Sequence, residues 1–147
     1  MPRVSPHHRQ RYPWFTGIAT RFADNDQYGH VNNAVYHAFF DTAVSLLLAR
    51  ELHYDFGGER YDAIVENHCT YLREIAFPDL ITAGVGVAHL GRSSVRFDIA
   101  LFVGEESQAR AQGWCVQVRC ERASGRPVAL EDTWRAAFER LRTREAA

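Results

Sequence analysis

Cysteine is scarce in this sequence. The 147 residues include three cysteines, Cys69, Cys115 and Cys120. Their number is odd, no two of them have the Cys-x-x-Cys spacing of a zinc site, and all three lie in strand-like segments. We therefore expect buried, reduced thiols and neither a disulfide framework nor a bound metal.

Long hydrophobic runs are also absent. No apolar segment approaches the ~18 residues that a membrane-spanning helix needs. The first ten residues contain Arg3, Arg9 and two histidines but no hydrophobic region of the kind found in secretory signals. We expect a cytoplasmic protein without a membrane partner.

The sequence has no excess of charge of either sign. Its net charge is -1, so no overall basic field favours a nucleic-acid partner. A hydrophobic content of 46% with 12% aromatic residues is enough for a substantial core in a chain of this length. We find no repeats and no linker, and expect one domain over residues 1–147 with an ordered core at about 12–142.

The most informative segment covers residues 21–50. Asp24 and Asp26 precede a loop that runs through Gly29 into a long segment without glycine or proline, which predicts a helix up to about residue 53. Asn32 or Asn33 is a suitable N-cap. Apolar residues cover almost all sides of this helix, so we expect other parts of the structure to surround it.

The remaining segments predict strands and a second helix. Alternating or β-rich residues predict strands at 14–22, 61–73, 80–90, 94–103 and 108–121. Apolar residues at helical spacing in 134–141 predict a short amphipathic C-terminal helix. Parallel strands would require a helix between each pair, so this order favours an antiparallel α+β sheet.

Residues 24–36, followed by Phe40 and Asp41, resemble the signature of a known family. The run Asp-Asn-Asp-Gln-Tyr-Gly-His-Val-Asn-Asn-Ala-Val-Tyr is similar to that of the 4-hydroxybenzoyl-CoA thioesterase-like family of hotdog-fold acyl-CoA thioesterases. Residues 71–79 and 90–94 resemble later family segments, so the resemblance covers about residues 14–141. It implies a five-stranded antiparallel sheet wrapped around one long central helix, a homodimer or homotetramer, and hydrolysis of an acyl-CoA thioester. Because CoA is part of that substrate, no cofactor is expected.

Two groups near the start of the helix suit thioester hydrolysis. A helix N-terminus carries roughly half a positive charge, so the backbone N–H groups of Gly29, His30 and Val31 are candidates for an oxyanion hole. The resemblance places the catalytic acid at Asp26 and leaves Asp24 to shape the loop, whereas spacing alone favours Asx-turns at both residues. Asp26 would act as a general base towards water or as a nucleophile, and the sequence does not separate these alternatives.

Other candidates have two interpretations each. His30 either orients the thioester or is a loop histidine bonded to a backbone carbonyl. Asn33 and Tyr36 either line the acyl site or serve as helix cap and core residue. Asp41, an acid in the middle of the helix, is a catalytic group, a supporting group, or one partner of an ion pair within a dimer.

The phosphates of CoA need cationic or N–H donors. Arg92, Ser93 and Ser94 in a predicted turn are candidates, and Arg73 is a weaker one. The alternative is that they are solvated surface residues.

Competing site types fit the spacing less well. Residues 24–35 begin like an EF-hand loop but have Tyr28 and Val35 at its fifth and twelfth positions, where oxygen ligands are needed. A transition-metal site at Asp26, His30, His37 and Asp41 is conceivable but disfavoured. No Gly-x-Ser-x-Gly elbow of a serine hydrolase is present. The alternative to an enzyme is a hotdog module that binds an acyl-CoA or acyl carrier without hydrolysing it.

Overall fold

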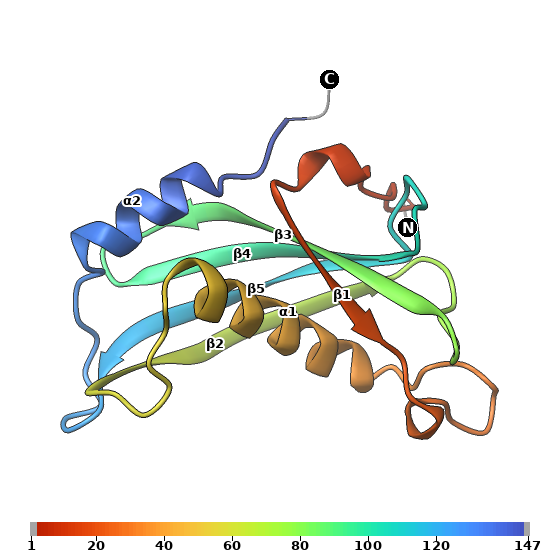
Figure 1. The fold of residues 1–147 in the computed structure, drawn as a ribbon, viewed down its shortest axis with the longest axis horizontal. Helices are drawn as coiled ribbons and strands as arrows, with labels where there is room; N and C mark the ends of the chain where they lie inside the picture. The colour runs from red at the N-terminus through yellow and green to blue at the C-terminus, as the bar shows by residue number, and fades with distance from the viewer. Residues whose placement is uncertain (1–2, 146–147) are drawn as a thin grey trace.

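The computed structural model describes residues 3–145, and within this range it contains one five-stranded antiparallel sheet and two α-helices (Figure 1). The spatial order of the strands is β1-β3-β4-β5-β2. The sheet curves around α1 (Figure 1), which confirms the predicted hotdog fold. The elements are β1 (Trp14–Ala19), α1 (Val35–Glu51), β2 (Arg60–Tyr71), β3 (Leu80–Leu90), β4 (Ser94–Val103), β5 (Ala111–Glu121) and α2 (Asp132–Arg140), with short 3-10 helices at Arg9–Arg11 and Phe22–Asp24.

The core lies between α1 and the concave face of the sheet. Val95, Phe97, Ile99 and Leu101 alternate along β4, and all four are buried in one cluster with the apolar residues of α1. Burying a large apolar side chain stabilises the fold by about 1.5–3 kcal/mol. Burial of these side chains therefore holds α1 against the inner face of β4.

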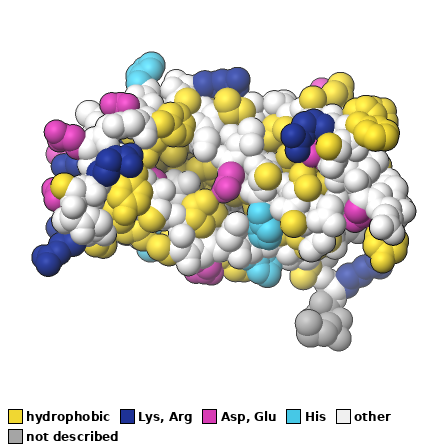
Figure 2. Space-filling model, turned by 90° about the horizontal axis from the view of Figure 1, so that it is seen from below, with side chains coloured by type: hydrophobic (Ala, Val, Ile, Leu, Met, Phe, Trp, Pro, Cys, Tyr) yellow, Lys and Arg dark blue, Asp and Glu magenta, His cyan; other side chains and the backbone are white. Residues whose placement is uncertain are grey.

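One side of α1 is open to solvent, which differs from our expectation. Ala38, Asp41 and Thr42 are exposed, and the expected burial of Asp41 is wrong. The sheet curves around only part of the helix circumference, and the small residues on the remaining side cost little when exposed. Seen from below, the molecule has a mixed surface of hydrophobic, basic, acidic and histidine side chains and no continuous apolar face (Figure 2).

The segment before β1 packs on the outer face of the sheet, although we expected the ordered core to begin at about residue 12. The buried amide of Gln112 accepts a hydrogen bond from the His7 N–H at 2.6 Å and donates one to the Ser5 carbonyl at 3.0 Å. Tyr12 is buried against Phe102. Such contacts depend on residues about 100 positions apart, so local patterns do not indicate them.

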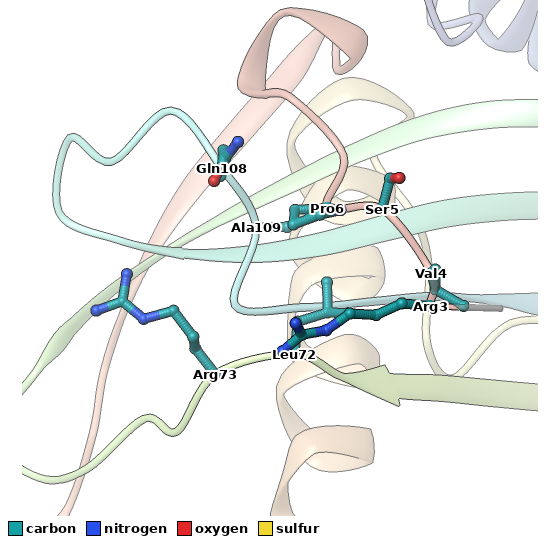
Figure 3. Close-up of a pocket in the computed structure, with 8 residues that line it drawn as sticks. All are labelled: Arg3, Val4, Ser5, Pro6, Leu72, Arg73, Gln108 and Ala109. Carbon is teal, nitrogen blue, oxygen red and sulfur yellow. The ribbon is translucent and has the colours of Figure 1, made fainter. Parts of the chain in front are cut away.

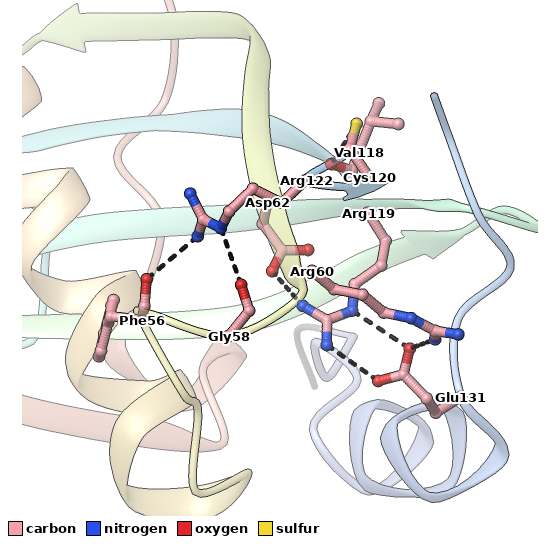
Figure 4. A network of polar contacts seen from close by, with 9 residues as sticks. All are labelled: Phe56, Gly58, Arg60, Asp62, Val118, Arg119, Cys120, Arg122 and Glu131. Atoms are coloured by element: carbon pink, nitrogen blue, oxygen red, sulfur yellow. Dashed lines mark hydrogen bonds and ion pairs between the residues drawn. The ribbon is translucent and has the colours of Figure 1, made fainter. Parts of the chain in front are cut away.

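An ion-pair network joins β2, β5 and the segment before α2. Arg119 of β5 bonds to Asp62 of β2 and to Glu131, which directly precedes α2, and Arg60 also contacts Glu131 (Figure 4). The predicted C-terminal helix is confirmed, and its Phe138 packs against Phe97 in the core. In residues 3–145, neither helix is long and apolar enough to cross a membrane.

Candidate active site

A hollow of about 450 Å³ lies where the loop between β1 and α1 meets the end of β2. It brings together six of the predicted site residues: Asp26, His30, Val31, Asn33, Tyr36 and Arg73. Four residues that we did not predict as site residues complete its lining: Tyr28, Tyr71, Leu72 and Glu74. The resemblance of residues 71–73 to a family segment was the available signal for Tyr71 and Leu72.

Asp24 shapes the loop from a buried position. Its carboxylate accepts hydrogen bonds from the backbone N–H and the guanidinium of Arg21, and its carbonyl accepts one from the Asn32 N–H at 2.9 Å. Burial alone would raise the pKa of Asp24, but the hydrogen bonds and charge of Arg21 outweigh it and lower that pKa. β1 accordingly ends at Ala19 and not at residue 22 as predicted, because the chain turns through the 3-10 helix Phe22–Asp24.

Asp26 is half-buried in the wall of the hollow. One carboxylate oxygen accepts a hydrogen bond from the Tyr28 N–H at 2.9 Å, and the other accepts one from the Asn32 side-chain amide at 3.2 Å. Within residues 3–145 the carboxylate forms no ion pair. Because each carboxylate oxygen has two lone-pair sites, both oxygens retain capacity for a further proton donor such as water.

Two of the three predicted oxyanion donors are already engaged. The Gly29 N–H donates to the Asp26 carbonyl at 3.0 Å, and the Val31 N–H donates to the Ile75 carbonyl at 2.8 Å. Gly29 has φ +82° and closes the turn, for which a residue without Cβ is suited. Among the described residues the His30 N–H has no hydrogen-bond partner. The assignment of Gly29 and Val31 as donors is therefore corrected, and the assignment of His30 stays a prediction.

The position of the helix explains this correction. We expected α1 to start at Asn32 or Asn33, which would put its first turn next to Gly29. Instead α1 starts at Val35, after a turn in which Asn32 accepts hydrogen bonds from the Ala34 N–H at 3.0 Å and the Val35 N–H at 2.9 Å. Residues 29–31 thus belong to the loop and pair with other loop segments.

Two tyrosines form one wall of the hollow. Their rings meet edge to face with centroids 4.9 Å apart, Tyr36 being buried in α1 and Tyr71 lying at the end of β2. The Tyr71 hydroxyl donates to the Asn33 carbonyl at 2.9 Å. Burial raises the pKa of both phenols, so both remain neutral at physiological pH.

One chain does not bring Arg92, Ser93 and Ser94 to this hollow. Ser94 begins β4, whereas Leu101, seven residues later, lies in register with Ala111 of β5. Ala111 in turn pairs with Tyr71, which lines the hollow. Seven residues of strand span about 23 Å, so the three residues lie at the opposite end of the sheet. Their role in phosphate binding stays a prediction that would require a second subunit.

Asp41 also lies outside the hollow, on the open side of α1. Partial burial raises the pKa of its carboxyl, and the nearby His37 opposes that shift. Asp41 therefore does not share a cavity with Asp26 within one chain.

A curved antiparallel sheet around one helix, with a carboxylate in a hollow before the helix, is the arrangement of hotdog thioesterases. The chain belongs to the thioesterase superfamily, because residues 28–109 match the model of that family. No match was found among curated proteins.

Solved structures agree with this assignment. The PA5185 protein from Pseudomonas aeruginosa is 44% identical, with a TM-score of 0.91, over 95% of this chain and 98% of that chain. A thioesterase from Thermus thermophilus, solved with coenzyme A and zinc, is 31% identical, with a TM-score of 0.73, over 88% of this chain and 93% of that chain. A 1,4-dihydroxy-2-naphthoyl-CoA thioesterase from Synechocystis shares the fold at 16% identity, with a TM-score of 0.76, over 84% of this chain and 93% of that chain.

Proposed function

We propose that this protein is an acyl-CoA thioesterase that releases a free acid and CoA. The observation that carries the proposal is the Asp26 carboxylate, which is half-buried, free of ion pairs within residues 3–145, and directed by two hydrogen bonds in the wall of a 450 Å³ hollow. Membership of the thioesterase superfamily and the relative solved with coenzyme A support a CoA thioester as the substrate.

The His30 N–H would stabilise the reacting carbonyl. A thioester oxygen placed beside this group accepts its hydrogen bond, and this hydrogen bond strengthens as negative charge develops on the oxygen. Only one N–H near Asp26 is assigned this role, in contrast to the three we expected. Loss of an oxyanion donor typically costs ~100- to 1000-fold in rate.

Asp26 would complete the reaction by one of two routes. As a general base, it takes a proton from a water whose oxygen adds to the carbonyl carbon, and the tetrahedral intermediate then expels the CoA thiolate. As a nucleophile, its oxygen bonds to the carbonyl carbon, CoA leaves, and water hydrolyses the resulting anhydride. The hydrogen bonds to Tyr28 and Asn32 hold the carboxylate in place for either route.

We also propose that the protein is a cytoplasmic homo-oligomer that needs no cofactor. The edge strand β2 is 12 residues long, and its Ile64 and Val65 side chains are 41% and 62% exposed. A long edge strand with exposed apolar side chains favours pairing with another chain. A second subunit packed there would cover these side chains.

A second candidate function is binding of an acyl-CoA without hydrolysis. The engaged N–H groups of Gly29 and Val31 favour it, because fewer donors are left to stabilise an oxyanion. Such a module would bind CoA esters and release no thiol.

A panel of acyl-CoAs and a thiol-specific colour reagent test the proposal. We expect thiol release by the wild type and a loss of about 10²- to 10⁴-fold in Asp26→Asn, the usual range for a general base. Glu105→Gln, at an exposed turn acid away from the hollow, is the matched control and should retain full activity. Activity that survives in Asp26→Asn but is lost in Asp41→Asn would show that the acid is misassigned. Thermal stabilisation by CoA esters without thiol release would favour the binding module.

A further inference from the structure

A second hollow adjoins the candidate active site. It has a volume of about 360 Å³, and we call it the arginine hollow. Leu72 and Arg73 line both hollows, so the two cavities meet at the end of β2. The arginine hollow is lined by Arg3, Val4, Ser5, Pro6, Leu72, Arg73, Gln108 and Ala109 (Figure 3).

Hydrogen bonds fix both sides of the arginine hollow to the start of β5. On one side, the buried Gln112 side chain bonds to the backbone of Ser5 and His7, and the Ala109 N–H donates to the His7 carbonyl at 2.9 Å. On the other side, the N–H groups of Leu72 and Arg73 both donate to a single carbonyl in the same stretch, that of residue 110, at 2.9 and 3.0 Å. The segment that carries Arg3 and the turn that carries Arg73 are therefore held at fixed positions beside each other.

The arginine hollow is cationic. Arg3 and Arg73 form no ion pair within residues 3–145, and no acidic residue lines this cavity. Arg110, by contrast, is paired with Glu106 at 2.6 Å. Figure 3 shows the Arg3 side chain running back toward Leu72, with the Arg73 side chain extending on the other side of Leu72. Guanidinium groups that are free of carboxylate partners favour phosphate oxygens.

The two cavities together match a ligand with two different ends. One end offers the Asp26 carboxylate and the His30 N–H for a thioester, and the other end offers two arginines for a polyanion. We propose that the arginine hollow binds the nucleotide phosphates of a CoA thioester, with the pantetheine arm passing Leu72 on its way to Asp26. This inference rests on the proposed function and adds to it that the protein selects CoA esters over thioesters without a nucleotide.

Steady-state kinetics with two substrates test this inference. The same acyl group is supplied on CoA and on pantetheine, which lacks the nucleotide. In the Arg3→Ala/Arg73→Ala double variant we expect KM for the acyl-CoA to rise about 10- to 100-fold, because each of the two lost contacts should weaken binding about three- to tenfold. The KM for the acyl-pantetheine should rise less than that for the acyl-CoA, because acyl-pantetheine lacks the nucleotide. Arg3→Ala alone, at a residue that lines the arginine hollow but not the Asp26 hollow, should leave both kcat values and the acyl-pantetheine KM within about twofold of the wild type.

Arg140→Ala is the matched control, because Arg140 is an exposed arginine of α2 that lines neither hollow. Added salt should raise the KM of the wild type for the acyl-CoA and have little effect in the double variant. An equal rise in KM for both substrates, or an unchanged KM for the acyl-CoA, would overturn the inference.

Direct binding separates this inference from the proposed function. If the wild type hydrolyses neither substrate, the proposed function has failed. Calorimetry with adenosine 3′,5′-bisphosphate, the nucleotide part of CoA, then decides the inference. Binding that is lost in the double variant and kept in Arg140→Ala supports the arginine hollow, and equal binding by all three proteins, or no binding by the wild type, refutes it.

Discussion

Arg119 is the side chain whose removal we expect to destabilise the protein most clearly. Its side chain is 8% exposed, and its guanidinium bonds to Asp62 at 2.8 Å and to Glu131 at 3.0 Å (Figure 4). The guanidinium carbon also lies 3.7 Å from the centre of the Trp134 ring. Methionine has a similar length and would keep part of this packing while removing the charge.

The expected cost of Arg119→Met comes mainly from Asp62. The Asp62 side chain is 7% exposed, so the variant leaves a buried carboxylate without its cation, whereas Glu131 keeps its contact with Arg60. Removing one partner of a buried ion pair typically costs about 3–5 kcal/mol. A protein of this size is stable by only about 5–15 kcal/mol, so the loss should be readily measured.

The loss should depend on pH. Burial already raises the pKa of Asp62 in the wild type, and Arg119 opposes that shift. Without Arg119 the pKa in the folded state rises further above its value in the unfolded chain, so the folded variant binds the proton more tightly. The penalty is then absent below the pKa of the unfolded chain, and it grows as the pH rises through the pKa of the folded state.

Urea unfolding of wild type and Arg119→Met at several pH values measures this difference. We expect a large stability deficit at neutral pH that shrinks in mild acid, and partial recovery when Asp62→Asn is added to the variant. Arg122→Met, at an exposed arginine whose guanidinium bonds to the Phe56 and Gly58 carbonyls and lies 5.3 Å from the centre of the Tyr61 ring, is the control and should cost about 1 kcal/mol or less. A deficit that is independent of pH and is not relieved by Asp62→Asn would refute the reasoning and point to the Trp134 contact.

Two further predictions concern stability and thiol reactivity. Gly113→Ala would place a Cβ against the His68 carbonyl of the paired strand β2, so we expect a loss of at least about 2 kcal/mol in thermal or urea unfolding, with Gly57→Ala as a nearly neutral control. A wild-type-like melting temperature for Gly113→Ala would contradict this. Burial raises the pKa of Cys69 to about 11 and that of Cys115 to about 12, so both thiols should react slowly with a thiol reagent at neutral pH and quickly in denaturant. Fast labelling of Cys115 in the folded protein would disagree.

Local patterns in the sequence were sufficient for most of the elements. The alternation in residues 94–103 predicted β4, and the apolar run without glycine or proline predicted α1, because these patterns reflect which side of each element is buried. The ends were less accurate. β1 stops at Ala19 because the following residues form a 3-10 turn in which Arg21 and Asp24 bond to each other. The alternation of apolar residues up to residue 22 did not indicate this turn.

The membership of the site was predicted in part. Asp26, His30 and Asn33 are close in sequence, and the loop that carries them is stabilised by its own short-range hydrogen bonds, such as the one from the Asn32 amide to Asp26. The engagement of the Val31 N–H could not be predicted, because its acceptor is the Ile75 carbonyl in a distant loop. The distance from Arg92 to the hollow likewise follows from strand register and not from sequence spacing.

The sequence by itself determined an antiparallel sheet, a long apolar helix and an acidic loop before that helix, since these depend on hydrophobic periodicity and on neighbouring residues, whereas the family resemblance implied that the sheet wraps around the helix. Only the tertiary structure decided which N–H groups remain free, which side of α1 is open and which arginine shares a hollow with Asp26. These features depend on contacts between residues far apart in the chain, and such contacts are established only when the strands pair in a particular register.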